Sequence, residues 1–279
     1  MSNKKIGILT SGGDCGGLNA AIRSIFYRAK NKYNMEVYGI RDGTAGLIKR
    51  PVDAIQLTYK TFAGYLLRQG GTFLGSTNKG NPFKIPTEDG KLVDKSKEII
   101  EGYHSMKLDG LVIIGGDGSM QILKKLAKDG DMKIVAIPKT IDNDVGATES
   151  SIGFHTAVDV ATQALDNLQS TAASHRRSMI LEVMGRDTGH IALNAGIAGG
   201  ADIIFTSGAT ESAALALSGQ NIMCSRIEHD AVNSWCSAKL STDRSGMVDI
   251  VKPEYSALQV ANSETGIIQK NVKGIWLSD

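Results

Sequence analysis

Cysteine, aromatic residues and long apolar runs are all scarce in this 279-residue sequence. Its three cysteines, Cys15, Cys224 and Cys236, lie far apart and lack the spacing of a metal site. A small, odd number of thiols is typical of proteins from the reducing cytoplasm. No apolar run approaches the ~20 residues of a membrane span, and a strand expected from about Lys5 leaves no room for a signal peptide. We therefore expect a cytoplasmic protein without a membrane segment.

An excess of one charge is lacking as well. Lysine and arginine number 31 against 29 aspartates and glutamates, which gives a net charge of +2, and like charges form no tail. This balance makes nucleic-acid binding an unlikely role, because such proteins gather basic residues on one face. Glycine, in contrast, is abundant: its 32 residues indicate backbone that closely approaches a ligand.

Short apolar runs alternate with helical patterns through the first two hundred residues. Each of three runs ends in a glycine-rich or polar loop, and such alternation predicts βαβ units. We expect an α/β fold, with a Rossmann-like, doubly wound parallel sheet whose ligands bind at the carboxyl ends of the strands. The runs are Ile6–Thr10, Leu111–Ile114 and Ile134–Ile137, followed by helices over 18–30, over 120–128 and from about Phe154; a further strand is expected over Ser178–Val183 and a helix over 189–198.

The loop Ser11-Gly-Gly-Asp-Cys-Gly-Gly17 joins the first strand to its helix. Bare peptide N–H groups and the start of the following helix can hold phosphate oxygens, and Gly13 is the candidate contact. The alternative is a tight turn that needs positive φ angles.

The loop Gly115-Gly-Asp-Gly-Ser119 follows the second strand. Gly116 and Gly118 would let backbone approach a triphosphate, and the Asp117 carboxylate would bind Mg²⁺, which prefers hard oxygen ligands. A plain Asp-Gly turn is the alternative. By itself this loop indicates a nucleotide-dependent kinase and no particular acceptor.

The third loop, Pro138-Lys-Thr-Ile-Asp-Asn-Asp144, carries two acids. A positioned carboxylate is needed to deprotonate an alcohol, and Asp142 is the candidate general base. Asp144 could help to hold the metal or the loop, and Thr140 could bond a phosphate. A solvated acidic loop is the alternative.

Arg177 and Arg186 are candidate phosphate clamps, because arginine makes planar, bidentate, charge-assisted bonds. Arg186 follows Met184 and Gly185 at an expected strand end. Arg176 and Arg177 could equally be a solvated pair.

Taken together and in this order, these motifs resemble 6-phosphofructokinase of the bacterial and cyanobacterial, ATP-dependent type, over about residues 5–204. The resemblance implies Mg²⁺, ATP and fructose 6-phosphate as ligands, and a homo-oligomer. It implies Asp117 on the metal and Asp142 as the catalytic base, with Thr140 and Arg186 also catalytic. It places Gly13, Gly116, Asp117, Gly118 and Ser119 at the nucleotide, and Thr140, Ile141, Asp142, Met184, Gly185 and Arg186 at the sugar phosphate, with Arg177 reaching that of a neighbouring subunit.

The phosphoryl donor can be argued from two positions. Pyrophosphate-dependent relatives place an aspartate where this chain has Gly118, and that side chain would crowd the α-phosphate of ATP. Lys139, however, is a residue that the pyrophosphate users also carry. We expect ATP, and a pyrophosphate-dependent enzyme is the alternative.

The resemblance changes after residue 204. The family's later fructose 6-phosphate ligands have no counterpart in residues 205–279, and about residues 203–279 instead resemble a truncated cysteine desulfurase of the class V aminotransferase type. That resemblance implies a pyridoxal phosphate pocket. Its candidates are Thr210, His229, Asn262, Ser263 and Asp279. We therefore divide the chain into residues 1–204 and 205–279, and we hypothesise a recombination or assembly junction. A catalytically impaired, nucleotide-binding chimera is the corresponding alternative function, with weak or absent turnover.

Overall fold

The computed structural model describes residues 4–77, 81–87, 89–177 and 179–203, then 211, 214–215, 217–219, 221–225, 228, 230–252, 255–258, 269 and 277–278. The chain forms two compact units, residues 1–157 (unit 1) and 158–279 (unit 2). Each unit is described by itself. The division between the units falls within a helix, whereas the boundary expected at residue 204 rests on family likeness and stays a prediction.

Unit 1 contains a six-stranded sheet in the order β3-β2-β1-β6-β7-β8. All neighbouring strands are parallel except β2 and β3, which are antiparallel. The order reverses beside β1, which is the arrangement of a doubly wound sheet, and the expected Rossmann-like fold is thereby confirmed. The strands are β1 (Lys5–Ser11), β2 (Glu36–Ile40), β3 (Ala54–Gln56), β6 (Gly110–Gly115), β7 (Ile134–Thr140) and β8 (Ile152–Gly153).

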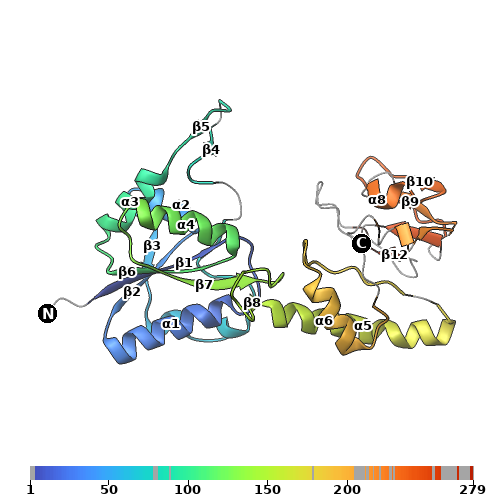
Figure 1. Cartoon of the computed structure of the whole chain (residues 1–279), viewed down its shortest axis with the longest axis horizontal. Coiled ribbons are helices and arrows are strands. Elements are labelled where there is room, and N and C mark those ends of the chain that lie inside the picture. Colours follow the sequence, from blue (N-terminus) through green and yellow to red (C-terminus); the bar gives the residue numbers. More distant parts are fainter. Residues whose placement is uncertain are drawn as a thin grey trace. The chain divides into compact units, whose positions relative to one another are not determined.

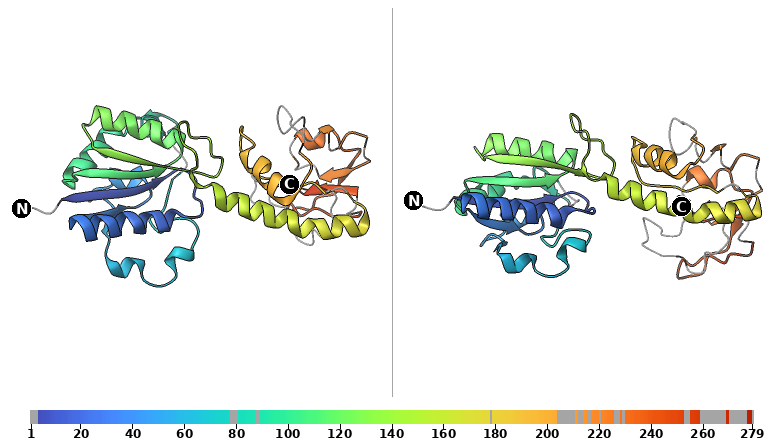
Figure 2. Two further views of the ribbon diagram at one scale, coloured as in Figure 1. Left: turned by 60° about the horizontal axis from the view of Figure 1, so that its bottom comes forward. Right: turned by 90° about the horizontal axis from the view of Figure 1, so that it is seen from below.

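Helices cover both faces of this sheet (Figures 1 and 2). α1 (Leu18–Tyr33) packs on one face, and α2 (Thr44–Ile48), α3 (Ser96–Ser105) and α4 (Asp117–Asp129) pack on the other. Successive strand residues point to opposite faces. Ile8 accordingly belongs to the apolar cluster on the α1 side, and Leu9 belongs to the cluster beneath α2, α3 and α4. A strand buried on both faces explains the uninterrupted apolar runs of the sequence.

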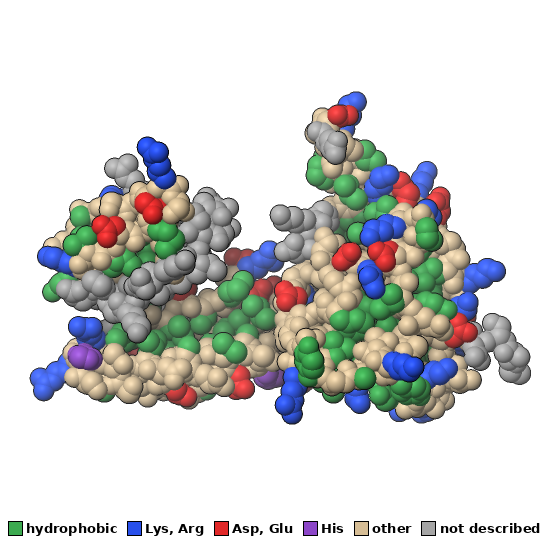
Figure 3. All heavy atoms as spheres, turned by 180° about the vertical axis from the view of Figure 1, so that it is seen from behind, with side chains coloured by type: hydrophobic (Ala, Val, Ile, Leu, Met, Phe, Trp, Pro, Cys, Tyr) green, Lys and Arg blue, Asp and Glu red, His purple; other side chains and the backbone are tan. Residues whose placement is uncertain are grey.

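Smaller elements border the sheet. Two 3₁₀ helices follow β3, and a short hairpin precedes α3. They are η1 (Tyr59–Phe62), η2 (Leu66–Arg68), β4 (Ile85–Pro86) and β5 (Leu92–Val93). Basic and acidic side chains intersperse over the face of unit 1 drawn in Figure 3, in line with the near-neutral net charge.

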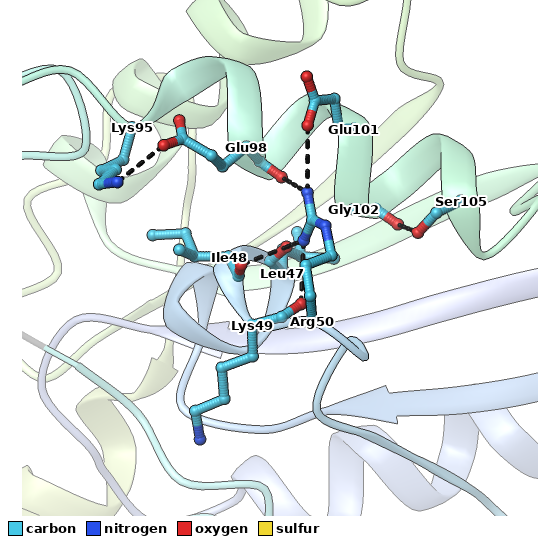
Figure 4. A network of polar contacts seen from close by, with 9 residues as sticks. All are labelled: Leu47, Ile48, Lys49, Arg50, Lys95, Glu98, Glu101, Gly102 and Ser105. Atoms are coloured by element: carbon cyan, nitrogen blue, oxygen red, sulfur yellow. Dashed lines mark hydrogen bonds and ion pairs between the residues drawn. The ribbon is translucent and has the colours of Figure 1, made fainter.

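Arg50 joins α2 to α3 (Figure 4). Its Nη1 donates to the carbonyl oxygens of Leu47 at 2.7 Å and Lys49 at 2.9 Å, and its Nη2 donates to the Glu98 carbonyl at 2.6 Å. The bonds to Leu47 and Lys49 satisfy carbonyls that the end of the five-residue helix α2 leaves without helical partners. Gly102 of α3 lies against the Leu47 carbonyl, where a Cβ would stand only 2.1 Å from the oxygen. The close approach of the two helices therefore requires glycine.

Unit 2 contains a four-stranded parallel sheet in the order β10-β9-β11-β12. The expected helix over 189–198 is observed as α6. The prediction of a strand over Ser178–Val183 is wrong, because residues 179–185 form no regular structure and pair with none of the described strands. The elements are α5 (Phe154–His175), which begins in unit 1, α6 (His190–Gly199), β9 (Met223–Ser225), α8 (Asp230–Asn233), β10 (Ala238–Leu240), β11 (Ser256–Leu258) and β12 (Leu277–Ser278). Within the described parts of the chain, no helix combines the length and apolar character that crossing a membrane requires.

Candidate active site

Three loops of unit 1 meet at one edge of the sheet. Ser11 of β1 is the register partner of Gly115 of β6, and Gly115 is the partner of Pro138 of β7. The three strands therefore end at the same level, and the loops that follow them lie at their carboxyl ends, where α/β sheets bind ligands. These are the loops in which the sequence predicts nucleotide and catalytic residues.

The loop after β1 is held by its neighbours and leaves its backbone open. The Gly12 N–H donates to the Thr77 carbonyl at 3.0 Å, and the Ser76 hydroxyl donates to the Gly12 carbonyl. Gly12 has a φ of 85°, a left-handed conformation that favours glycine. Gly13 is exposed, and a Cβ built there would meet no atom within 4 Å. Space for a ligand is therefore open over the backbone at Gly13.

The loop after β6 turns at once into α4. Gly116 is the N-cap, and the helix begins at Asp117, three residues earlier than the sequence predicts. The positive end of the helix dipole and its unpaired N–H groups favour an anion at this point. The Ser11 hydroxyl donates to the Ser119 hydroxyl at 3.0 Å and so joins the first two loops. At Gly118 a Cβ would meet open space.

Asp117 is an exposed carboxylate in the first turn of α4. The Gln121 side chain donates to its Oδ2 at 2.6 Å, and no described residue hydrogen-bonds its Oδ1. Among the described residues no three His, Cys, Asp or Glu side chains gather around a metal position. Mg²⁺ is commonly held by one carboxylate together with substrate phosphates and water, so this donor set fits a nucleotide-borne magnesium ion.

Lys139 links the first loop to the third. Its side chain is buried, with 4% of the residue exposed, and its Nζ donates to the Gly13 carbonyl. Burial lowers the pKa of this ammonium group below its ordinary value, and negative charge on Cys15, Asp14 and Asp142 opposes that shift. A cation therefore lies beneath the phosphate-binding backbone and close to the predicted base.

The third loop holds Asp142 in a defined turn. The Asp142 N–H donates to the Thr140 hydroxyl at 3.1 Å, and the same hydroxyl lies 3.4 Å from Asp142 Oδ2. Asn143 has a φ of 53°, and its Oδ1 accepts the Ser151 N–H at 2.8 Å. The Ser151 hydroxyl donates to the Thr140 carbonyl at 2.6 Å. The loop is therefore fastened to β8, with the Asp142 carboxylate half-buried at its surface.

The surroundings of Ile141 and Asp144, two further predicted residues of this loop, differ from those of Asp142. Ile141 is partly buried, and its side chain packs against the apolar cluster on the α1 side. Asp144 is exposed, two residues beyond the base.

Four predicted sugar-phosphate residues belong to unit 2. Arg177, Met184 and Arg186 are exposed, and Met184 is 74% exposed. Gly185 is buried, and its carbonyl accepts the Thr188 hydroxyl at 3.0 Å in a turn before α6. The structure thus brings Met184, Gly185 and Arg186 together in unit 2, whereas it brings the predicted nucleotide residues and Asp142 together in unit 1. The candidates for pyridoxal phosphate, Thr210, His229, Asn262, Ser263 and Asp279, lie outside the described residues.

Sequence reasoning did not identify how the loops are joined. It named Lys139 only for donor choice and gave no role to Ser11 or Ser76, which bond to the facing loops. The available signal was that Ser11 and Lys139 each stand at or near a strand end beside glycine-rich loops.

The fold and this site define an α/β protein with phosphate-binding loops at the carboxyl ends of parallel strands. A family model described as phosphofructokinase matches residues 5–233, and the chain belongs to the phosphofructokinase family.

Two curated relatives are cyanobacterial. The ATP-dependent 6-phosphofructokinase 1 of Synechocystis sp. is 60% identical over 201 residues, which are 72% of this chain and 55% of the relative. The protein of the same name from Nostoc sp. is 59% identical over 202 residues, 72% of this chain and 56% of the relative. The chain thus spans about half the length of these curated relatives. A crystal structure of Pichia pastoris phosphofructokinase in the T-state matches with a TM-score of 0.63 and 31% identity, over 76% of this chain and 24% of that chain.

The resemblance of residues 203–279 to cysteine desulfurases is not supported by these comparisons. The phosphofructokinase family model continues past the expected junction at residue 204 to residue 233.

Proposed function

We propose that this chain binds ATP with magnesium and is built to transfer the γ-phosphoryl group to the 1-hydroxyl of fructose 6-phosphate, which gives fructose 1,6-bisphosphate. One observation carries the proposal. Three strand-end loops are joined by the Ser11–Ser119 hydrogen bond and by Lys139 reaching Gly13, with Asp142 held in the third loop. The cyanobacterial relatives, which are named as ATP-dependent kinases of this kind, add support.

Phosphate binding falls to backbone and to one buried cation. The N–H groups around Gly13 and Gly116 and the amino end of α4 face the same sheet edge, and Lys139 adds positive charge there. Asp117 would hold magnesium, which when bound neutralises the phosphate oxygens during transfer. Phosphoryl transfer passes through a loose transition state, so positioning and charge neutralisation account for most of the catalysis.

Asp142 receives the proton. Its backbone N–H donates to the Thr140 hydroxyl, which also lies 3.4 Å from its Oδ2, so this residue is held in place at the loop. The 1-hydroxyl of the sugar gives its proton to Asp142 as its oxygen bonds to the γ-phosphorus and the bond to the ADP oxygen breaks. A positioned base of this kind contributes roughly 10²–10⁴-fold to the rate.

Gly118 favours ATP as the donor. Open space surrounds its Cα, so the α-phosphate of a nucleotide meets no side chain there. Lys139 is compatible with pyrophosphate as well, because its bond to Gly13 puts a cation near any phosphate in this loop. Steric space discriminates between the donors more than one cation does, and we therefore propose ATP.

The sugar half of the site is less complete than the nucleotide half. Arg177, Met184, Gly185 and Arg186 supply candidate contacts to the sugar phosphate, and Arg177 would serve a neighbouring subunit of a homo-oligomer. The family's later sugar ligands have no counterpart in residues 205–279. We therefore expect firm nucleotide binding and weak or absent fructose 6-phosphate turnover.

An ADP-release assay with fructose 6-phosphate and Mg-ATP tests the function. We expect any sugar-dependent turnover to fall at least about 100-fold in Asp142→Asn, while Mg-ATP affinity is kept. Asp89→Asn, an exposed acid in the turn between β4 and β5, is the matched control and should behave as the parent. Unchanged turnover in Asp142→Asn would exclude this base, and binding without any turnover would identify a non-catalytic nucleotide-binding chain.

A further inference from the structure

Two cysteines, a lysine and an asparagine form a cluster in unit 2. Cys224 on β9 and Lys239 on β10 are register partners in the parallel sheet. The Lys239 Nζ donates to the Cys224 sulfur at 3.3 Å and to the Asn233 carbonyl at 3.0 Å. The Cys224 sulfur also lies 3.3 Å from Asn233 Oδ1. The second thiol, Cys236, packs against the same apolar cluster as Cys224 and hydrogen-bonds it.

The two thiols differ in burial and in charge. Cys224 is fully buried and Cys236 is half-buried, and both are free of disulfides. The hydrogen bond from Cys236 and the Lys239 ammonium lower the pKa of Cys224 to about 7, against the opposing effects of burial and the Glu228 charge. The same hydrogen bond, together with burial, raises the pKa of Cys236 above its ordinary value. At neutral pH Cys224 is therefore partly thiolate, beside a Cys236 that keeps its proton, and the protonated form of Cys224 donates to Asn233 Oδ1.

Cys15 in unit 1 provides an internal contrast. Burial raises the pKa of this thiol to about 11, and its sulfur lies 3.4 Å from the Ile152 carbonyl. The thiolate is the reactive form of cysteine, so Cys15 is expected to be inert.

We propose that Cys224 and Cys236 form a peroxide-sensitive thiol pair that closes reversibly to a disulfide. The Cys224 thiolate attacks one oxygen of hydrogen peroxide, the O–O bond breaks, and hydroxide leaves and takes up a proton as water. Cys224 is then a sulfenic acid. The Cys236 sulfur attacks the Cys224 sulfur, the S–O bond breaks, and the second water leaves with the Cys236 proton. Two thiols and one peroxide thus give one disulfide and two waters.

Peroxide is the oxidant that fits this geometry. Cys224 has no exposed surface, so a small uncharged molecule reaches it more readily than a bulky disulfide or alkylating reagent. The Lys239 ammonium stabilises the attacking thiolate, and the half-buried Cys236 is positioned to resolve the sulfenic acid. Redox-sensing cysteines commonly have a low-pKa thiol next to a resolving thiol. Cys224 differs from most of them in being buried, which restricts its oxidants to small molecules.

The test oxidises the whole chain with hydrogen peroxide at pH 7.5 and follows it by intact mass and peptide mapping. We expect a loss of two hydrogens, a Cys224–Cys236 bond, and reversal by dithiothreitol. At this pH a much larger fraction of Cys224 than of Cys15 is thiolate, because the pKa of Cys224 is lowered and that of Cys15 is raised. Nucleophilicity falls as the pKa falls, but more slowly than the thiolate fraction rises, so Cys224 should react at least about 10-fold faster than Cys15.

Variants separate reactivity from structure. Cys236→Ser should stop at a sulfenic acid that dimedone traps, Cys224→Ser should not react, and Cys15→Ser should behave as the parent. Lys239→Met should shift the midpoint of the rate against pH upward from about 7, and Lys239→Arg should restore it. Oxidation of Cys224 in the unaltered chain no faster than that of Cys15, or a disulfide other than Cys224–Cys236, would overturn the proposal.

Discussion

At position 118 we propose that the lack of a side chain decides which phosphoryl donor the loop accepts. A Cβ there meets open space, and the residue lies in the first turn of α4. Gly118→Asp should weaken Mg-ATP binding by about 10- to 100-fold, because a carboxylate facing an α-phosphate places like charges together.

Gly118→Ala is the control for this change. The added methyl group meets no neighbouring atom and improves helix propensity, so the affinity for ATP should stay within about twofold of the parent. Calorimetric titration with Mg-ATP and with magnesium pyrophosphate measures both variants. Equal ATP affinity in the parent and in Gly118→Asp would remove Gly118 as the determinant of the donor.

Cys15 should make the stability of unit 1 fall in mild alkali. Burial raises its folded pKa to about 11 from 9.0, so between these values the folded chain keeps a proton that the unfolded chain has lost. Its stabilisation is complete below pH 9 and decreases above it, by about 1 kcal/mol between pH 8 and 10. Urea unfolding of the parent and Cys15→Ala over this range gives the difference. Lys139 is present in both proteins, so the comparison isolates the contribution of Cys15. A difference in unfolding free energy that is flat or rises with pH would contradict the account.

At the level of elements, Arg50 holds the short helix α2 to α3. Its guanidinium donates to carbonyls of both segments, so Arg50→Met should destabilise unit 1 by about 1–3 kcal/mol. Arg50→Lys should recover only part of this, because an ammonium lacks the planar fork. Glu101→Gln removes only an exposed ion pair and should cost less than about 1 kcal/mol. Denaturant midpoints compare the three, and a larger loss in Glu101→Gln than in Arg50→Met would reverse this assignment.

β1 and β6 could be predicted because their apolar residues are buried on both faces of the sheet, whereas β7, with Val135 63% exposed, is predicted from its apolar run alone. β1, β6 and β7 appear where apolar runs predict them, and each extends by one to three residues into its loop. α4 starts earlier than expected because Gly116 caps it and Asp117 suits its first turn. Residues 178–183 read as a strand in isolation, but a strand needs a neighbour for its backbone groups, and none of the described strands pairs with residues 179–183. Periodicity does not contain that information.

The site could be predicted in its composition but not in its connections. Gly13, Asp117 and Asp142 follow three strand ends, and parallel register brings strand ends together. The hydrogen bond from Lys139 to Gly13 joins residues that are 126 positions apart in the sequence, and no local sequence pattern predicts such a contact. The partial burial of Ile141 against the apolar cluster likewise depends on the packing of α1.

At the scale of the whole molecule, two compact units predict two unfolding transitions. Both tryptophans, Trp235 and Trp276, lie in unit 2, and six of seven tyrosines lie in unit 1. Mg-ATP at about 100 times its dissociation constant should stabilise the tyrosine-reported transition by about 2.7 kcal/mol and leave the tryptophan transition in place. Magnesium alone is the control. A joint shift of both transitions would show that the units unfold together.

Hydrogen–deuterium exchange with and without Mg-ATP tests most directly whether the strand-end loops of unit 1 bind a magnesium nucleotide. We expect slowed exchange in peptides that cover residues 11–17 and 116–119, no change in the β4–β5 hairpin, and loss of the effect in Asp117→Asn. Mg-ATP protection confined to other segments, or none at saturating nucleotide, would contradict the proposed site.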